Sequence, residues 1–153
     1  MILRHLHAGI TVSNLERSIE FYRDIVGLTL IRREPPRATR ERKLGVPGAK
    51  VEIAVMHYGE HQDSVELIKY HLPDSPNSYG APVNAIGQIH LTFKVDNIAA
   101  EIKRMKALGV EFIGGDDYGE NMEGPLAGWK WIYFKDPDGT NLELIEGKLE
   151  GLV

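Results

Sequence analysis

The pattern of apolar and polar positions near the start of the chain predicts a strand followed by a helix. Residues 7–12 mix apolar and small side chains, as half-buried strands do. Ser13 followed by Glu16 forms a capping box, which predicts that the helix begins here. The apolar positions of this helix recur at helical spacing: Leu15, Ile19, Tyr22 and Val26. Gly27 suits the left-handed conformation in which many helices end.

A later stretch repeats this pattern, and β-type runs follow each helix. Asp96 is the predicted N-cap of the second helix, and Gly109 is its predicted end. The apolar stripe of this helix consists of Ile98, Ile102 and Met105. Asp136 to Gly139 predict a tight turn before the last strand. The other predicted strands are LTLI (28–31), VEIAVM (51–56) and VELIKY (65–70), then VEFI (110–113), KWIYF (130–134) and NLELIE (141–146).

The two stretches are copies of one unit of about 80 residues. Aligning HAGITVSNLERSI (7–19) with HLTFKVDNIAAEI (90–102) pairs identical residues: His7 with His90, Val12 with Val95, Asn14 with Asn97, and Ile19 with Ile102. The copies end in similar tetrapeptides, VELI (65–68) and LELI (142–145). The sequence therefore predicts an α+β fold of two tandem βαβββ modules whose curved sheets form a cleft. We expect a single domain over 1–153, with module one at about 1–70, a linker at about 71–88 and module two at about 89–148.

The duplication brings four residues of metal-ligand type into equivalent positions. The first predicted strand of each copy carries a histidine, and the last carries a glutamate: His7 and His90, and Glu66 and Glu143. Two imidazoles and two carboxylates suit one divalent ion such as Zn, Ni, Co, Mn or Fe. A strand histidine taken alone is more often structural, and a strand glutamate more often faces solvent. The remaining histidines have no counterpart in the other copy, so we expect them on the surface or in loops: His5, His57, His61 and His71.

The amino-acid composition argues against several classes of function. The 153 residues suit one domain, carry a formal net charge of −4 and contain no cysteine. The lack of a basic excess argues against a nucleic-acid partner, and the lack of cysteine excludes disulfides, thiolate metal sites and cysteine nucleophiles. No stretch approaches the about 18 apolar residues of a membrane span, and no signal-peptide pattern is present. We therefore expect a soluble cytoplasmic protein with a small-molecule partner and without nucleic-acid or membrane partners.

Three segments resemble a known family: HAGITVSNLERSIEFYRDIVGL (7–28), IHLTFKVDNI (89–98) and YFKDPDGTNLELIE (133–146). They look like the vicinal oxygen chelate superfamily of glyoxalases, bleomycin-resistance proteins and dioxygenases, and the resemblance covers nearly the whole chain. It implies paired βαβββ modules, one divalent metal ion in the cleft and a homodimer. Carried over position by position, it places the metal ligands on the residues that the repeat also indicates: His7, Glu66, His90 and Glu143.

Within the superfamily the chain is most similar to the glyoxalase I and methylmalonyl-CoA epimerase branch, which implies a metal-dependent isomerase, lyase or epimerase. In such enzymes a metal ion polarises a carbonyl while a carboxylate moves the neighbouring proton. The resemblance implies that Glu143 is both ligand and base. Glu52 falls where the epimerases carry a second acid/base glutamate; an ordinary outward-facing strand residue is the alternative. The epimerases usually have an amide at the position of Glu66, so the glutamate here is closer to glyoxalase I.

Other activities of the superfamily are alternatives at this point. An Fe(II) extradiol-type dioxygenase or a fosfomycin-resistance-type thiol transferase uses three protein ligands, so a fourth ligand counts against both. A metal-free bleomycin-resistance-like binding protein has no need for four ligand-type residues. Glutathione adducts, acyl-CoA esters and small 2-oxo compounds all fit as substrates. The sequence also leaves open the metal, and whether one chain or a dimer completes the site.

Three further segments have both a functional and a passive interpretation. Residues 31–50 carry seven basic residues against two acidic ones, so they either attract an anionic substrate group or form a solvated loop. The glycine-rich residues 114–128 form either a lid or a passive loop. The aromatic residues after them are expected in strands and core, with one of them available to line a pocket: Trp129, Trp131, Tyr133 and Phe134.

Overall fold

The chain divides into two compact units, Met1–Ser78 and Tyr79–Val153, which we call the N-terminal and C-terminal units. The structure is a computed structural model, and it describes residues 1–38, 44–59, 64–76 and 81–148.

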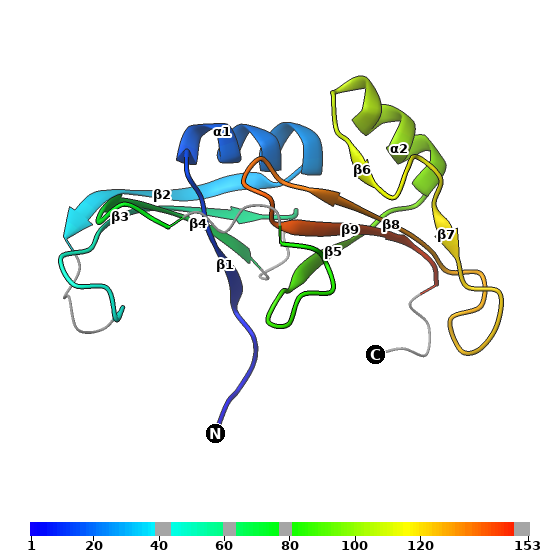
Figure 1. The fold of residues 1–153 in the computed structure, drawn as a ribbon, viewed down its shortest axis with the longest axis horizontal. Coiled ribbons are helices and arrows are strands. Elements are labelled where there is room, and N and C mark those ends of the chain that lie inside the picture. The colour runs from blue at the N-terminus through cyan, green and yellow to red at the C-terminus, as the bar shows by residue number, and fades with distance from the viewer. Residues whose placement is uncertain (39–43, 60–63, 77–80, 149–153) are drawn as a thin grey trace. The chain divides into compact units, whose positions relative to one another are not determined.

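The N-terminal unit is a four-stranded mixed sheet with one helix on it. Its elements are β1 (His7–Thr11), α1 (Leu15–Glu20), a π-helical continuation η1 (Phe21–Val26), β2 (Thr29–Ala38), β3 (Lys50–His57) and β4 (Ser64–Leu72). The strand order is β1-β4-β3-β2, with β1 parallel to β4 and the other neighbours antiparallel. Helix α1 packs on β3 and β4 and lies along one face of the sheet (Figure 1). We call this the helix face and the opposite side the open face.

The predicted apolar stripe of the first helix is confirmed, and its cap lies one residue later than expected. Leu15, Ile19 and Tyr22 are buried, and Val26 is half-buried. The N-cap is Asn14 and not Ser13, because the Asn14 side-chain oxygen accepts a hydrogen bond from the backbone N–H three residues on, at 3.1 Å. Gly27 ends the helical stretch in the left-handed conformation, with φ of 89°, as predicted.

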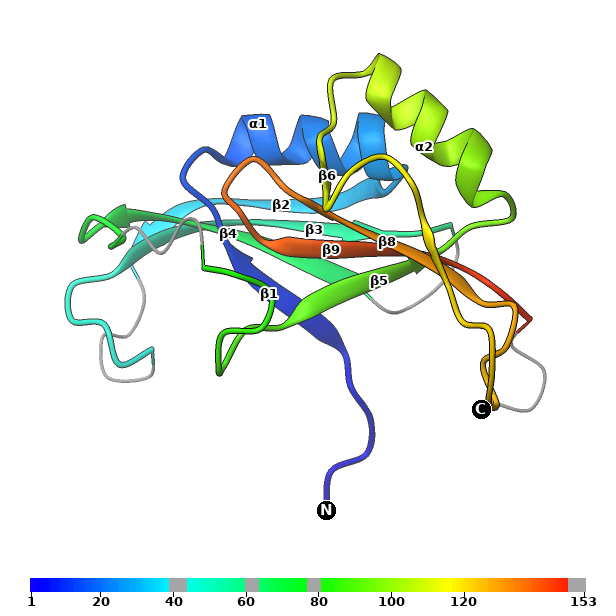
Figure 2. The ribbon, with the colours of Figure 1, turned by 45° about the vertical axis from the view of Figure 1, so that its right-hand side comes forward.

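The C-terminal unit repeats this arrangement. Its elements are β5 (His90–Lys94), α2 (Ile98–Ala107), β6 (Phe112–Ile113), β7 (Gly119–Glu120), β8 (Lys130–Lys135) and β9 (Asn141–Glu146). The strand order is β5-β9-β8-β6, with the short β7 also paired to β8. Strand β5 is parallel to β9 as β1 is to β4, and Figure 2 shows α2 above its own sheet. The predicted α+β fold of duplicated βαβββ modules is therefore confirmed.

The second helix differs from its prediction in the same way as the first. Asn97, the repeat equivalent of Asn14, is the N-cap and accepts from the Ala100 N–H at 2.9 Å, so the predicted cap Asp96 is wrong by one residue. The predicted stripe of Ile98, Ile102 and Met105 is buried. Neither this helix nor any other in the described part of the chain is long and apolar enough to cross a membrane.

The turn before β9 forms as predicted. Two backbone N–H groups, those of Asp138 and Thr140, donate to the buried Asp136 carboxylate at 2.9 and 2.8 Å. Gly139 adopts φ of 88° and donates its N–H to the Asp136 carbonyl. The turn fixes the start of β9, which carries the glutamate of the C-terminal copy.

Three boundaries differ from the sequence prediction. Strand β2 extends well beyond the predicted LTLI run and includes Pro35 and Pro36, which sit at a register shift on an edge strand where a missing N–H is tolerated. Strand β4 continues to Leu72, so the predicted linker at 71–88 begins inside it. Part of the glycine-rich stretch 114–128 forms β7, where Gly119 faces the Trp131 ring so closely that an added Cβ would lie 2.6 Å from it.

Candidate metal centre

The N-terminal unit brings His7 and Glu66 together on the open face of its sheet. They lie on the parallel neighbours β1 and β4, where Gly9 is the register partner of Glu66 and His7 is two residues before Gly9. The His7 Nε2 atom lies 3.5 Å from Glu66 Oε2. The flanking Val65 and Leu67 point to the other side and are buried, because successive strand side chains alternate between faces. The alternation predicted for Glu66 is therefore present.

The C-terminal unit brings His90 and Glu143 together in the equivalent way. Thr92 is the register partner of Glu143, as Gly9 is of Glu66, and His90 is two residues before it. The His90 Nε2 atom lies 3.4 Å from Glu143 Oε2. Leu142 and Leu144 flank the glutamate and are buried. The four ligand candidates thus form two matching pairs, one in each unit.

The geometry of each pair fits the coordination of a shared cation. Separations of 3.4 and 3.5 Å exceed an ordinary N–H···O hydrogen bond of about 2.7–3.2 Å. Two ligand atoms each about 2.0–2.2 Å from one ion, at angles between octahedral and tetrahedral, lie about 2.8–3.6 Å apart. The imidazoles of His7 and His90 are 43% and 46% exposed, and the carboxylates of Glu66 and Glu143 are 18% and 11% exposed. In each pair the carboxylate is therefore the less exposed partner and the imidazole the more accessible one.

No group of three or more His, Cys, Asp or Glu side chains that could hold a metal gathers among the residues that the structure describes. Each unit on its own supplies one histidine–glutamate pair. Imidazole nitrogen and carboxylate oxygen are suitable donors for borderline divalent ions, so the chemistry of the donors agrees with the prediction from the repeat.

Two hydroxyl residues lie beside the C-terminal pair: Thr92, which was not identified from the sequence, and Tyr133, which was expected mainly in a strand or the core. The Thr92 hydroxyl donates a 2.7 Å hydrogen bond to Glu143 Oε2. Tyr133 is the register partner of Glu143 on β8, and its ring packs edge-on against His90 with centroids 5.2 Å apart. Burial, together with the hydrogen bond and charge of Glu143, raises the pKa of the Tyr133 phenol, so the phenol stays protonated at neutral pH. The alternation His90-Leu91-Thr92 could have identified Thr92, because residues two apart share a strand face.

Glu52 lies on the other side of its sheet from Glu66. Val55 is the β3 register partner of Glu66, and a residue three positions away on a strand points to the opposite face. The helix face is confirmed by Arg33, which bonds both Glu52 and Glu16 on α1, at 2.9 and 2.8 Å. The second oxygen of Glu52 contacts the ring of His71 at 2.9 Å. Glu52 is therefore buried on the helix face and is not the outward-facing residue of the alternative, and its acid/base role stays a prediction.

The basic segment at 31–50 is partly neutralised by ion pairs. Arg32 and Arg37 both pair with Glu34, the former at 3.2 Å, and Arg33 is held by Glu16 and Glu52 as described above. The other basic residues of the predicted patch that precede Leu44 lie outside the described residues: Arg40, Arg42 and Lys43. His61, expected in a loop, also lies outside them.

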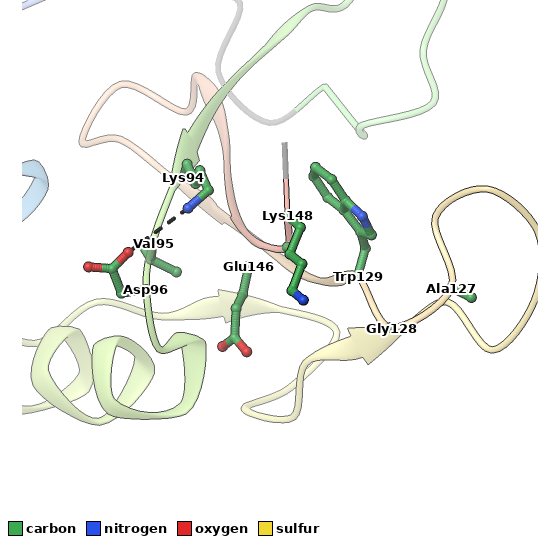
Figure 3. A pocket seen from close by; sticks show the side chains of 9 residues that line it. Lys94, Val95, Asp96, Ala127, Gly128, Trp129, Glu146 and Lys148 are labelled. Atoms are coloured by element: carbon green, nitrogen blue, oxygen red, sulfur yellow. Dashed lines mark ion pairs between the residues drawn. The ribbon is translucent and has the colours of Figure 1, made fainter. Parts of the chain in front are cut away.

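A hollow of about 540 Å³ lies within the C-terminal unit at the ends of β5 and β9 (Figure 3). Its lining includes Lys94, Trp129, Glu146 and Lys148. Glu146 is engaged by the Ile98 N–H at 2.7 Å and by Lys130 at 2.9 Å, and these two partners lower the pKa of its carboxyl. Neither His90 nor Glu143 belongs to the lining, so the hollow is separate from the C-terminal pair.

Comparison with known proteins agrees with the observed fold. Residues 4–144 match the family described as the glyoxalase/bleomycin resistance protein/dioxygenase superfamily. The chain is 32% identical to a lactoylglutathione lyase of Salmonella typhimurium over 97% of its own length and 96% of the relative. It is also 32% identical to a 2-epi-5-epi-valiolone epimerase of an Actinomyces species, over 91% of this chain and 76% of that protein.

Solved structures show the same fold. A glyoxalase family protein from Bacillus cereus matches with a TM-score of 0.78 and 26% identity over 95% of both chains. An antibiotic-binding protein from Streptomyces, TnmS3, matches with a TM-score of 0.61 at 19% identity, over 96% of this chain and 98% of the other. The second likeness concerns the fold alone, and it shows that this fold also serves proteins described as binders.

Proposed function

Because the chain belongs to the glyoxalase/bleomycin resistance protein/dioxygenase superfamily, we propose that it is a divalent-metal-dependent isomerase, lyase or epimerase that moves a proton next to a substrate carbonyl. Curated relatives that are lyases and epimerases support an activity of this general kind. The observation that carries the metal dependence is the matched geometry of the two pairs, each with a histidine nitrogen 3.4–3.5 Å from a glutamate oxygen.

The proposed ligands are His7 and Glu66 from one unit and His90 and Glu143 from the other. The pairs occupy equivalent strands with equivalent register, so each contributes the same two donor types. We propose that the two pairs complete one site, within one chain or across two chains of a homodimer. Four donors of this kind would hold the ion and would leave part of its coordination shell for substrate oxygens.

The cation supplies Lewis acidity to a substrate carbonyl, which acidifies the neighbouring C–H bond. The chain's own part is to bind the substrate and to move the proton. Glu143 accepts the proton from the carbon next to the carbonyl and, in an isomerase, returns it to the adjacent carbon while the hydroxyl proton passes to the former carbonyl oxygen. In an epimerase, a second acid on the opposite face of the carbon would donate a proton there, and Glu143 would keep the one it accepted. Both outcomes conserve the proton, and neither requires an oxidant or a second substrate.

Two alternatives within the superfamily predict different results. An Fe(II) dioxygenase needs three protein ligands and three open positions, whereas the proposal uses four protein ligands. A binding protein of the bleomycin-resistance type needs no ligand pair, yet both units retain one. The prediction of a cytoplasmic homodimer with a small-molecule substrate comes from the sequence and accompanies this proposal.

Proton exchange tests the proposal whatever the physiological substrate is. The protein, supplied in turn with Ni²⁺, Co²⁺, Zn²⁺ and Mn²⁺, is incubated in D₂O with lactoylglutathione, 2-epi-5-epi-valiolone, a branched acyl-CoA ester and a small 2-oxo acid. Proton NMR then follows the C–H next to each carbonyl. We expect exchange in at least one compound, and its loss in Glu143→Gln but not in the matched control Glu123→Gln, which changes an exposed loop residue.

Equal exchange with and without protein for every compound would contradict the proposed chemistry. Oxygen uptake with catechols in the Fe²⁺-loaded protein, without proton exchange, would favour the dioxygenase. Tight binding of a ligand by the metal-free protein, again without exchange, would favour the binding protein.

A further inference from the structure

The two pairs differ in one respect that the repeat does not reveal. Beside Glu143, both neighbouring strands present a hydroxyl group, from Thr92 on β5 and Tyr133 on β8. Beside Glu66, the equivalent register positions hold Gly9 on β1 and Val55 on β3. Glycine and valine have no hydroxyl, so they cannot restrain a carboxylate in this way. The C-terminal half of the proposed site is therefore built differently from the N-terminal half.

We propose that Thr92 and Tyr133 are positioning residues that hold the Glu143 carboxylate in one orientation, so that the C-terminal pair is preorganised and the N-terminal pair is not. The inference rests on the proposed function, because Glu143 is there the expected ligand and base. It adds two residues that act through Glu143 and a division of roles between the two pairs.

The Thr92 contact fixes a particular oxygen of the carboxylate. Its hydroxyl donates to Glu143 Oε2 at 2.7 Å, the same oxygen that lies 3.4 Å from His90 Nε2. A bond of this length to a charged acceptor is among the stronger hydrogen bonds in proteins. The Glu143 side chain is only 11% exposed, so little water competes for that oxygen. The hydroxyl therefore turns Oε2 toward the imidazole and opposes rotation of the carboxylate.

Tyr133 restrains both members of the pair. It is the register partner of Glu143 on the neighbouring strand β8, and its ring meets His90 at an interplanar angle of 88° with centroids 5.2 Å apart. An edge-to-face contact of this kind limits the rotation of the imidazole. Orienting partners behind a metal ligand typically change metal affinity by about 10- to 100-fold when they are removed. Glu66 has neither type of neighbour at these positions, so we expect it to reorient more freely.

Cobalt affinity of the full chain tests this directly, with Co²⁺ titrated into metal-free protein and followed by its visible absorption. The variants are Thr92→Val, which keeps the shape of the side chain, and Tyr133→Phe. We expect each to weaken Co²⁺ binding about tenfold or more. The controls are Thr11→Val, on the same face of the equivalent strand β1, and Tyr58→Phe, at an exposed tyrosine, and both should bind as the wild type does.

A second measurement gives a result even without metal. Urea unfolding of the metal-free protein is compared for Thr92→Val, Glu143→Leu and the double variant. Hydrogen bonds to charged groups contribute measurably to stability. The factor by which Thr92→Val raises the unfolding constant should therefore be about tenfold smaller in the Glu143→Leu background than in the wild type. Additive effects would overturn the proposal.

The outcomes separate this inference from the proposed function. Wild-type affinity in Thr92→Val and Tyr133→Phe, in a protein that binds Co²⁺, would overturn the positioning role and leave the metal site intact. A wild-type protein that binds none of the ions would contradict the proposed function, while the urea cycle would still decide whether Thr92 holds Glu143.

Discussion

Replacing Arg33 with methionine removes the guanidinium that links Glu52 to the helix. Arg33 contacts Glu52 Oε1 through Nε at 2.9 Å and through Nη2 at 2.8 Å, and it reaches Glu16 through Nη1 at 2.8 Å. The Glu52 side chain is 10% exposed and that of Arg33 is 43% exposed. The substitution keeps most of the aliphatic volume of the side chain and leaves a buried carboxylate with the ring of His71 as its remaining described partner at 2.9 Å.

The expected cost follows from the burial of the two partners. Removing one partner of a fully buried ion pair costs about 3–5 kcal/mol. Water reaches the arginine side of this pair and His71 still contacts the carboxylate, so we expect a loss of about 1–3 kcal/mol at pH 7. Arg32→Met is the matched control. Its pair with Glu34 spans 3.2 Å with the arginine 60% exposed, and we expect a loss below about 1 kcal/mol.

The same pair predicts a pH dependence. Burial raises the pKa of the Glu52 carboxyl, but the hydrogen bonds from His71 and Arg33 and their charges outweigh it, so the pKa lies below its ordinary value of 4.5. A carboxyl whose pKa is lower in the folded state stabilises the fold above the unfolded pKa, and this contribution is lost as the pH falls through the folded pKa. The stability difference between wild type and Arg33→Met should therefore be full at pH 7 and shrink below about pH 4.5.

Urea unfolding at pH 7 and pH 3, followed by fluorescence of the two tryptophans, measures both effects. Equal stability of Arg33→Met and Arg32→Met at pH 7 would refute the reasoning, as would a difference that persists unchanged at pH 3. The catalytic alternative makes the opposite prediction for Glu52→Gln. Loss of proton exchange at unchanged stability would support Glu52 as an acid/base residue, whereas its ion pairs lead us to expect lower stability with Co²⁺ affinity retained.

Two further substitutions test the local structure. Gly119→Ala would place a Cβ 2.6 Å from the Trp131 ring, so thermal unfolding should show a loss of about 1–3 kcal/mol. In Gly9→Ala the nearest atom to the new Cβ, apart from its chain neighbours, would be 3.4 Å away, so the loss of stability should be clearly smaller. Equal losses in the two variants would contradict the close approach at β7. Asn97→Ala should cost about 1 kcal/mol and Asp96→Ala less than about 0.5 kcal/mol. The reverse order in chemical denaturation would return the cap of α2 to Asp96.

The fold could be predicted from the sequence because the repeat and the hydrophobic periodicities agree. The identical positions in 7–19 and 90–102 implied equivalent strands and helices, and both sheets do have the same strand order. Helix starts were predicted one residue early, because Ser13 and Asp96 are as capable of capping as the asparagines that follow them. Local chemistry cannot choose between adjacent cap-forming residues, whereas the tertiary path of the chain can.

The parts of the site that depend on neighbouring strands could not be predicted in this way. The position of Glu52 depends on how β3 pairs with β4, and the register between two strands cannot be predicted from either strand alone. The arginine and histidine that engage it are 19 residues away on either side. The comparison of the two copies did not indicate Thr92 and Tyr133 as site residues, because the first copy has Gly9 and Val55 at the equivalent positions. Aligning the two copies identifies residues that both share, and it does not identify functional residues that only one copy has.

The stoichiometry of metal binding tests the central claim most directly. Metal-free protein is titrated with Co²⁺ and the bound metal is counted per chain, for the wild type and for one variant in each unit, His7→Gln and His90→Gln. We predict one ion per chain, with binding weakened by both variants because both pairs hold the same ion. Two ions per chain, with each variant losing only one, would show that each pair binds separately, and no binding at all would contradict the metal centre.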